Sequence, residues 1–138
     1  MSDRVPLRRS GTVTPVVRYD DAAAGIRWLN EVAGFETDLL VERDGAVEHA
    51  ELWHGDGVIV VMSLVEFRPE KPVLPSGPAH IEITVTDVRA ALERALAAGG
   101  EVAVPLVDSI VGLAFTLRDP EGNLWTFGSY RPGTFVGS

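Results

Sequence analysis

The feature that most constrains the fold of this chain is a pattern of signals that occurs twice. In each half, a β-branched segment leads to an aspartate that can cap a helix, an amphipathic stretch follows, and a glycine ends it. The pattern runs from Asp20 or Asp21 to Gly34 in the first half, and from Asp87 to Gly100 in the second half. Three strand-like segments follow each helix. Each half therefore predicts one strand, one helix and three further strands.

The strands that follow each helix are separated by turn signals. Asp44-Gly45 lies between two apolar segments and is a strong hairpin signal, and Asp56-Gly57 repeats the same device. In chain order, the expected elements are a strand at 12–19, a helix at about 21–33, strands at 35–43, 47–53 and 58–64, a strand at 79–85, a helix at about 88–98, and strands at 102–107, 113–117 and 124–128.

The length of 138 residues fits one domain, which we place at residues 11–130. Within it, the first module is expected at about 12–65 and the second at about 79–129. The segment 66–78 contains four prolines, which exclude a central strand or a helix, so we expect a linker there. Residues 1–10 are polar with three arginines and predict a flexible arm, and residues 131–138 form a tail.

The composition excludes several classes of function. A formal net charge of -8 and a pI near 4.8 argue against a nucleic-acid partner, because phosphate binding needs a basic face. No apolar stretch is long enough to cross a membrane, and the N-terminus has no secretory signal. The absence of cysteine excludes disulfides, thiolate metal sites and cysteine nucleophiles. We expect a cytoplasmic protein that has neither a nucleic-acid nor a membrane partner.

Three stretches carry a resemblance to a known family. They are VTPVVRYDDAAAGIRWLNEVAGFE at 13–36, HIEITVTDV at 80–88, and RDPEGNLWTFG at 118–128. The chain resembles the vicinal oxygen chelate superfamily, and within it the proteins related to glyoxalase and to bleomycin-resistance proteins. The resemblance implies an α+β fold in which two βαβββ modules form a curved mixed sheet around a cavity. It also implies a homodimer, because two chains in this family commonly complete each other's cavities.

The resemblance further implies where a metal ion would be bound. In the metalloenzymes of the superfamily, side chains on the first and last strands of each module hold a divalent ion inside the cavity. At these positions this chain has Thr14, a residue among 60–62, His80 and Thr126. His80 is the one match, and hydroxyl or aliphatic side chains do not replace imidazole and carboxylate ligands. We therefore expect no cofactor, with a divalent metal in a rearranged site as the alternative.

His80 and Glu82 are the candidate catalytic residues. Positions i and i+2 of a strand point to the same face, so both side chains are expected together. In an apolar cavity, Glu82 can act as a base, or it can hold His80 protonated. The simpler alternative for each residue is a hydrogen-bonded strand histidine and a solvated carboxylate.

Four other residues are candidates for ligand binding, together with Thr126. Arg18 has the parity of the cavity side of its strand and can bind a ligand carboxylate through two hydrogen bonds, or lie at the cavity rim. His49, Glu51 and Trp53 alternate along one strand and share a face, and Trp53 can stack on a flat or cationic ligand.

Three hypotheses follow. The first is a metal-free protein that sequesters a drug or metabolite, as bleomycin-resistance proteins do, and the acidic balance of the chain suits a cationic ligand. The second is an enzyme of the lyase, isomerase or oxygenase type with a rearranged metal site or an acid–base site, supported by His80 and Glu82. The third is a dimeric regulatory or accessory module without small-molecule chemistry, which no residue positively supports.

Overall fold

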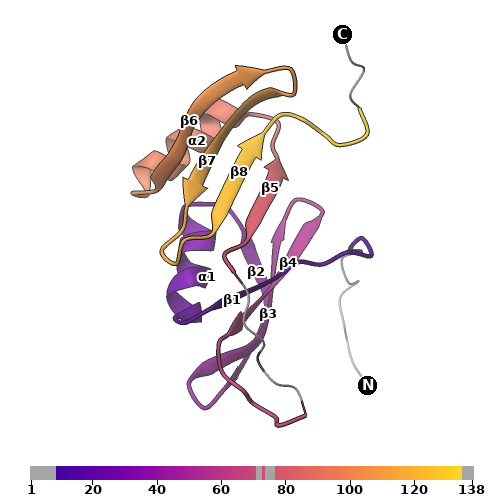
Figure 1. Ribbon diagram of the computed structural model, residues 1–138, viewed down its shortest axis with the longest axis vertical. Coiled ribbons are helices and arrows are strands. Elements are labelled where there is room, and N and C mark those ends of the chain that lie inside the picture. Colours follow the sequence, from indigo (N-terminus) through magenta and orange to yellow (C-terminus); the bar gives the residue numbers. More distant parts are fainter. Residues whose placement is uncertain (1–8, 71–72, 74–76, 135–138) are drawn as a thin grey trace.

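The computed structural model describes residues 9–70, 73 and 77–134, so most of the expected arm and the end of the tail lie outside the described residues. In chain order the elements are β1 (Val16–Tyr19), α1 (Ala22–Glu31), β2 (Glu36–Arg43), β3 (Ala46–His54), β4 (Gly57–Ser63), β5 (His80–Thr84), α2 (Val88–Ala97), β6 (Glu101–Ser109), β7 (Gly112–Arg118) and β8 (Leu124–Gly128) (Figure 1). This order confirms the expected α+β fold class with two βαβββ modules. No helix in the described part of the chain is long and apolar enough to cross a membrane.

Each module forms a four-stranded mixed sheet of the same topology. The first sheet has the order β1-β4-β3-β2 and the second has the order β5-β8-β7-β6, with a parallel pair at β1–β4 and at β5–β8. Equivalent pairs, such as Arg18↔Met62 and Thr84↔Gly128, are 66 positions apart along the chain (84 − 18 and 128 − 62). Among the described residues the two sheets are separate, so the expected curved sheet is divided between the modules.

The helix ends follow the predicted signals. Asp21 and Asp87 are the N-caps, and the side chain of each accepts a hydrogen bond of 3.0 Å from the backbone N–H three residues later. Gly34 follows α1 with a φ of 84°, which L side chains rarely adopt. β1 begins at Val16, later than expected, because Pro15 has no N–H for the β-sheet, although its carbonyl accepts a hydrogen bond from Val60.

One predicted turn lies one residue earlier than expected. At the first hairpin, Asp44 and Gly45 both have positive φ, as a type I′ turn requires. At the second, His54 pairs with Gly57, and the residue with positive φ is Gly55. The central turn residues are therefore Gly55 and Asp56. A glycine at the first of these positions suits a type II′ turn, whose backbone twist matches the strands that it joins.

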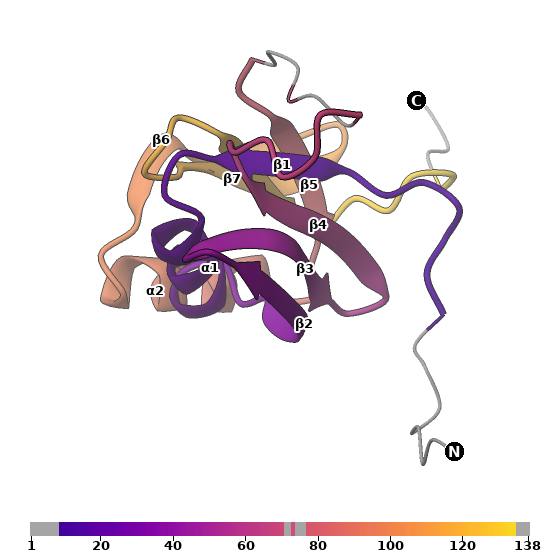
Figure 2. The ribbon, with the colours of Figure 1, turned by 90° about the horizontal axis from the view of Figure 1, so that it is seen from below.

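The two modules share one hydrophobic core, built from the inner face of each sheet and from both helices, which lie on one side of the molecule (Figures 1 and 2). The ring centroids of Trp28 on α1 and Trp125 on β8 are 6.2 Å apart, and those of Phe35 and Trp125 are 5.7 Å apart. Trp125 is fully buried, as its parity opposite to Thr126 predicted. The modules therefore meet through their helix-covered faces.

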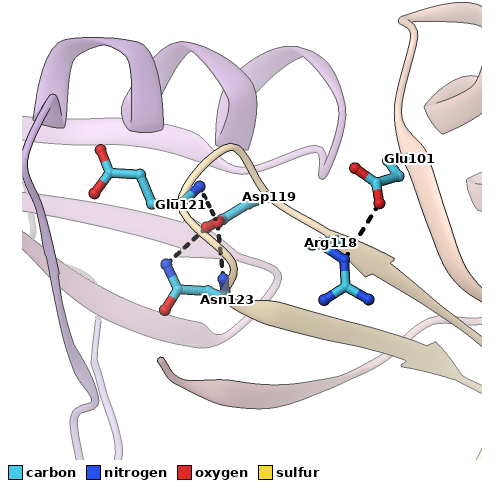
Figure 3. A network of polar contacts seen from close by, with 5 residues as sticks. All are labelled: Glu101, Arg118, Asp119, Glu121 and Asn123. Carbon is cyan, nitrogen blue, oxygen red and sulfur yellow. Dashed lines mark hydrogen bonds and ion pairs between the residues drawn. The ribbon is translucent and has the colours of Figure 1, made fainter. Parts of the chain in front are cut away.

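The turn between β7 and β8 contains a buried carboxylate that joins the modules. Asp119 is 3% exposed and its carboxylate accepts five hydrogen bonds, of which Figure 3 shows those from Glu121 and Asn123. Within its own module, the donors are the backbone N–H groups of Glu121 and Asn123, the side-chain amide of Asn123 and the indole N–H of Trp125. From the other module, the Tyr19 hydroxyl donates at 2.6 Å. This bond is charge-assisted and short.

Two further features of this turn strengthen the connection between the modules. The carboxylate oxygens of Glu121 accept hydrogen bonds of 2.8 and 2.9 Å from the backbone N–H groups of Asp20 and Asp21, just before α1. Burial raises the pKa of the Tyr19 hydroxyl far above its ordinary value, and the hydrogen bond and negative charge of Asp119 raise it further. Tyr19 is therefore a permanent hydrogen-bond donor to Asp119.

His54 lies between the modules, against aromatic rings of both. Its ring centroid is 5.3 Å from that of Phe35 and 6.3 Å from that of Phe127 of the second module. Burial lowers the pKa of His54 below its ordinary value of 6.5, and the nearby charge of Arg94 lowers it further. A positive charge at His54 therefore opposes the packing of the two modules.

We expect Tyr19→Phe to lower the free energy of unfolding by about 1.5–3 kcal/mol, because it removes a hydrogen bond to a buried carboxylate. Urea denaturation measures this difference. Tyr130→Phe is the matched control, because the Tyr130 hydroxyl has no hydrogen bond among the described residues. Equal stability of the two variants would show that the Tyr19–Asp119 bond does not hold the modules together.

We expect the free energy of unfolding to decrease as the pH is lowered, in part because of His54. Because its folded pKa lies below the unfolded value of 6.5, its contribution is fully present above pH 6.5 and is lost as the pH falls through the folded pKa. Between about pH 7.5 and about pH 5, the wild-type protein should therefore lose more unfolding free energy than His54→Gln. Parallel pH profiles of the two proteins would contradict this assignment.

Candidate functional site

Alternation along the strands gives each sheet an outer face turned away from the core. In β1, Val17 and Tyr19 are buried in the core, so Val16 and Arg18 point to the opposite side. We call this surface of β1-β4-β3-β2 the first outer face. The corresponding surface of β5-β8-β7-β6, opposite the buried Trp125 and Phe127, is the second outer face. The candidate residues of the sequence fall on both faces.

A cavity of about 670 Å³ lies on the first outer face and is also lined by four described residues that follow β4. Its floor consists of apolar side chains from β1, β2 and β4, and arginine, glutamate and histidine side chains surround this floor. The lining residues are Val16, Arg18, Val41, Arg43, Glu48, His49, Val60, Met62, Val65, Phe67, Arg68 and Val73. Two of the predicted ligand-binding residues, Arg18 and His49, therefore line the same cavity.

An irregularity in the pairing of β2 and β3 brings an additional acid into this cavity. Val41 pairs with His49 and Glu42 pairs with Val47, which leaves Glu48 as an extra residue on β3. A bulge of this kind interrupts the alternation of side chains. Glu48 and His49 consequently both line the cavity, although they are neighbours in sequence.

The charge of the cavity does not follow that of the whole chain. Nε of Arg43 lies 3.0 Å from Oε1 of Glu48, and Nη2 of Arg68 lies 4.0 Å from Oε2 of the same carboxylate. Within the described part of the chain, Arg18 makes no hydrogen bond or ion pair. Among the described residues of the lining, three arginines and one glutamate give a charge of +2 (3 − 1) with His49 counted as neutral, whereas the whole chain carries -8.

The other two candidates on β3 have different positions. Glu51 lies beside the cavity, and its Oε2 is 2.9 Å from Nε2 of His49. Trp53 is 5% exposed and is not among the residues that line this cavity. It lines a separate cavity of about 520 Å³ between the modules, together with residues of the segment that leads into α2. Trp53 does not belong to the shared core, and it has the same parity on β3 as Glu51, because Ala50 and Leu52 between and beside them are buried in the core.

The candidates on the second outer face form a group of their own. Nε2 of His80 is 2.9 Å from Oγ1 of Thr126, which is 2.7 Å from Oγ1 of Thr116. Glu82 pairs with Thr126 in the parallel register of β5 and β8, and both His80 and Glu82 are exposed. None of the three predicted residues His80, Glu82 and Thr126 lines the cavity of the first outer face.

The metal site that the resemblance implies needs several strong ligands close together. Among the described residues, no group of three or more histidine, aspartate or glutamate side chains could hold a metal ion. Of the four positions implied by the resemblance, His80 supplies one imidazole, and its neighbour is the hydroxyl of Thr126. This donor set does not fit a catalytic divalent ion, which normally has three strong protein ligands.

The sequence analysis did not identify several residues of the cavity. Arg43 and Glu48 lie on predicted strands but were not selected, because strict alternation does not reveal a bulge. Phe67, Arg68 and Val73 belong to the segment that was predicted only as a linker. The composition of this segment was the one available signal, because a simple spacer needs neither an aromatic residue nor an arginine.

A family model described as Glyoxalase/Bleomycin resistance protein/Dioxygenase superfamily matches residues 11–127 of the chain. Uncharacterized protein Rv0887c of Mycobacterium tuberculosis (strain ATCC 25618 / H37Rv) is 29% identical over 133 residues. That alignment covers 91% of this chain and 78% of the mycobacterial protein.

Solved structures show the same architecture. TioX from Micromonospora sp. ML1 is similar with a TM-score of 0.70 and 30% identity, covering 86% of this chain and 99% of that chain. Lactoylglutathione lyase from Agrobacterium tumefaciens gives a TM-score of 0.67 at 19% identity, covering 87% of this chain and 93% of that chain. At this level of identity, the similarity to the lyase concerns the fold alone.

Proposed function

This chain belongs to the Glyoxalase/Bleomycin resistance protein/Dioxygenase superfamily, and on that premise we propose that it binds a small molecule on the first outer face and sequesters it. The ligand in this proposal is a drug or a metabolite, and resistance to an antibiotic is the corresponding role for a drug. The observation that carries the proposal is the cavity lined by Arg18 and His49. The chain contains no cysteine, and we therefore propose the cytoplasm as the location of the protein.

The cavity has the properties of a small-molecule site. Its volume of about 670 Å³ lies in the range of ligand-binding clefts, which are mostly apolar with a few polar groups. Val16, Val60 and Met62 are adjacent on β1 and β4 and supply an apolar floor. A ligand that covers this floor gains the free energy of burying apolar surface, and the surrounding arginines can select among ligands.

The donor set supports binding without the superfamily's metal ion. Catalysis in the superfamily's metalloenzymes depends on strong ligands at four positions, and this chain has His80 at one of them. Neither Thr14 nor Thr126 supplies an imidazole or a carboxylate. The side chains of the cavity can bind and orient a ligand, and they include no nucleophile paired with a general base.

A second candidate function is an enzyme of the lyase, isomerase or oxygenase type. The observation in its favour is the row of hydrogen bonds from His80 through Thr126 to Thr116, with Glu82 on the same strand as His80. An imidazole bonded to a hydroxyl can transfer a proton, and Glu82 supplies a second acid–base group on the same face. Substrate conversion by the purified protein, lost in His80→Ala, would favour this alternative.

We also propose that the protein is a homodimer in which the outer faces are covered. The register places Val16 and Val41 on the first outer face, and it places Val104 and Val107 on the second outer face. Each of these side chains is 40–50% exposed, which is high for apolar residues on a sheet. A second chain that covers both faces removes this apolar surface from water and closes the cavity.

The proposed function predicts ligand binding that does not require a metal. Among drug-like natural products and metabolites, we expect at least one compound to raise the melting temperature of metal-free protein, because a ligand that binds the folded state stabilises it. Met62→Trp should abolish this stabilisation by filling the cavity. Leu96→Trp is the matched control, because Leu96 is exposed on α2, away from the cavity.

Calorimetry with Zn²⁺, Ni²⁺, Mn²⁺ and Fe²⁺ completes this test. We expect no tight stoichiometric binding, since the residues described above supply too few strong ligands. Tight binding that is lost in His80→Ala would contradict metal-free sequestration, and would require glyoxalase and dioxygenase assays on the metal-loaded protein.

The proposed dimer predicts a mass in solution of twice the 14.8 kDa of one chain, measured by light scattering after size exclusion. Val104→Glu combined with Val107→Glu should give a monomer, because it places two charges on the apolar part of the second outer face. Ile110→Glu is the control, since Ile110 is 83% exposed in the turn between β6 and β7. A monomeric wild-type protein would contradict the proposal.

A further inference from the structure

We propose that the ligand of the cavity is an organic anion, a carboxylate on an apolar body, and that Arg18 binds its charged group. This inference rests on the proposed function and specifies the class of ligand. It reverses the preference for a cation that the acidic composition suggests, because the charges that a ligand meets are those of the cavity and not those of the whole surface.

Arg18 is held in a fixed position by its strand. Its chain neighbours Val17 and Tyr19 are buried in the core, and its backbone pairs with Met62 in the parallel register of β1 and β4. The side chain is half-buried and lies among the apolar residues of the cavity floor. A guanidinium on a rigid strand, beside apolar surface, is well placed to bind a carboxylate through two parallel hydrogen bonds.

The charge of Arg18 is not compensated within the described part of the chain, where it makes no hydrogen bond or ion pair. Glu48 is the single carboxylate among the described residues that line the cavity, and it already interacts with both Arg43 and Arg68. Its side chain is 21% exposed, whereas the side chains of the two arginines are about half exposed. Glu48 therefore fixes these two cations at the cavity and leaves Arg18 available for a ligand.

Arg18 also lines an adjoining cavity of about 210 Å³ together with Asp20 and Glu121, and the carboxylate of Glu121 accepts hydrogen bonds from the backbone N–H groups of Asp20 and Asp21. The acid beside the first cavity is engaged as well. Glu51 lies beside the lining, and its carboxylate is 2.9 Å from the imidazole of His49. Counting Glu51, the three arginines still exceed the two carboxylates by one positive charge (3 − 2) with His49 neutral. An anion entering the cavity therefore meets an excess of positive charge, and its apolar body covers Val16, Val60 and Met62.

The test compares three probes with one apolar body, namely naphthoate, naphthamide and naphthylmethylammonium with the same ring position substituted. Calorimetry on the full chain should show saturable binding of naphthoate, weaker binding of naphthamide, and weakest binding of the ammonium compound. Arg18→Gln should weaken naphthoate binding by about tenfold or more, because it removes a charge-assisted hydrogen bond. Added salt should weaken the binding of naphthoate more than that of naphthamide.

Two variants provide matched controls. Arg27→Gln makes the same change in charge at an exposed position of α1 and should leave naphthoate binding unchanged. Arg18→Lys keeps the charge but loses the planar pair of donors, so its affinity should lie between those of the wild type and Arg18→Gln. The mass of Arg18→Gln in solution is measured in parallel, and it should equal that of the wild type.

Several results would overturn the inference. These are equal binding of the three probes, preferential binding of the ammonium compound, absence of naphthoate binding, and naphthoate binding that Arg18→Gln does not change. A change in the mass of Arg18→Gln would assign Arg18 to an interface and would also overturn it. If other compounds still stabilise the protein and Met62→Trp abolishes the effect, only the ligand class is wrong. If no compound binds, the proposed function fails as well.

Discussion

The carboxylate of Asp119 is buried at the junction of the two modules, and the arrangement of the modules depends on the groups that donate hydrogen bonds to it. A buried charge is very unfavourable unless hydrogen bonds replace the lost water. Four of its five bonds come from its own module, and the fifth comes from Tyr19 of the other. In the same turn, the carboxylate of Glu121 accepts hydrogen bonds from the backbone N–H groups of Asp20 and Asp21, just before α1. A short polar turn thus fixes the position of one module relative to the other.

This junction has a direct effect on the candidate site. Because the modules pack through their helix-covered faces, the opposite face of each sheet is left without a covering layer inside the chain. On the first sheet, Val65, Phe67, Arg68 and Val73 from the segment after β4 line the cavity together with Arg18. On the second sheet, His80 and Glu82 remain exposed. These candidate residues therefore lie on surfaces that the shared core does not use.

Much of the fold is encoded in local signals that the sequence displays. Asp21 and Asp87 cap the starts of the two helices as predicted, and Gly34 follows the end of α1. The alternation along β1 correctly separates Arg18 from the core. The role of Asp119 was not predictable in this way, because the turn itself explains an aspartate there and Tyr19 is 100 positions away. The bulge at Glu48 was also hidden, since it depends on pairing between strands and not on composition.

The offset of 66 positions between equivalent residues means that one architecture is present twice in a single gene product. At matching places the two copies differ: Arg18 corresponds to Thr84, and Thr14 corresponds to His80. The shared core is built from the inner faces of the two sheets and from the helices. The outer face of each copy can therefore differ in sequence, as Arg18 and Thr84 do, while both copies contribute to one core.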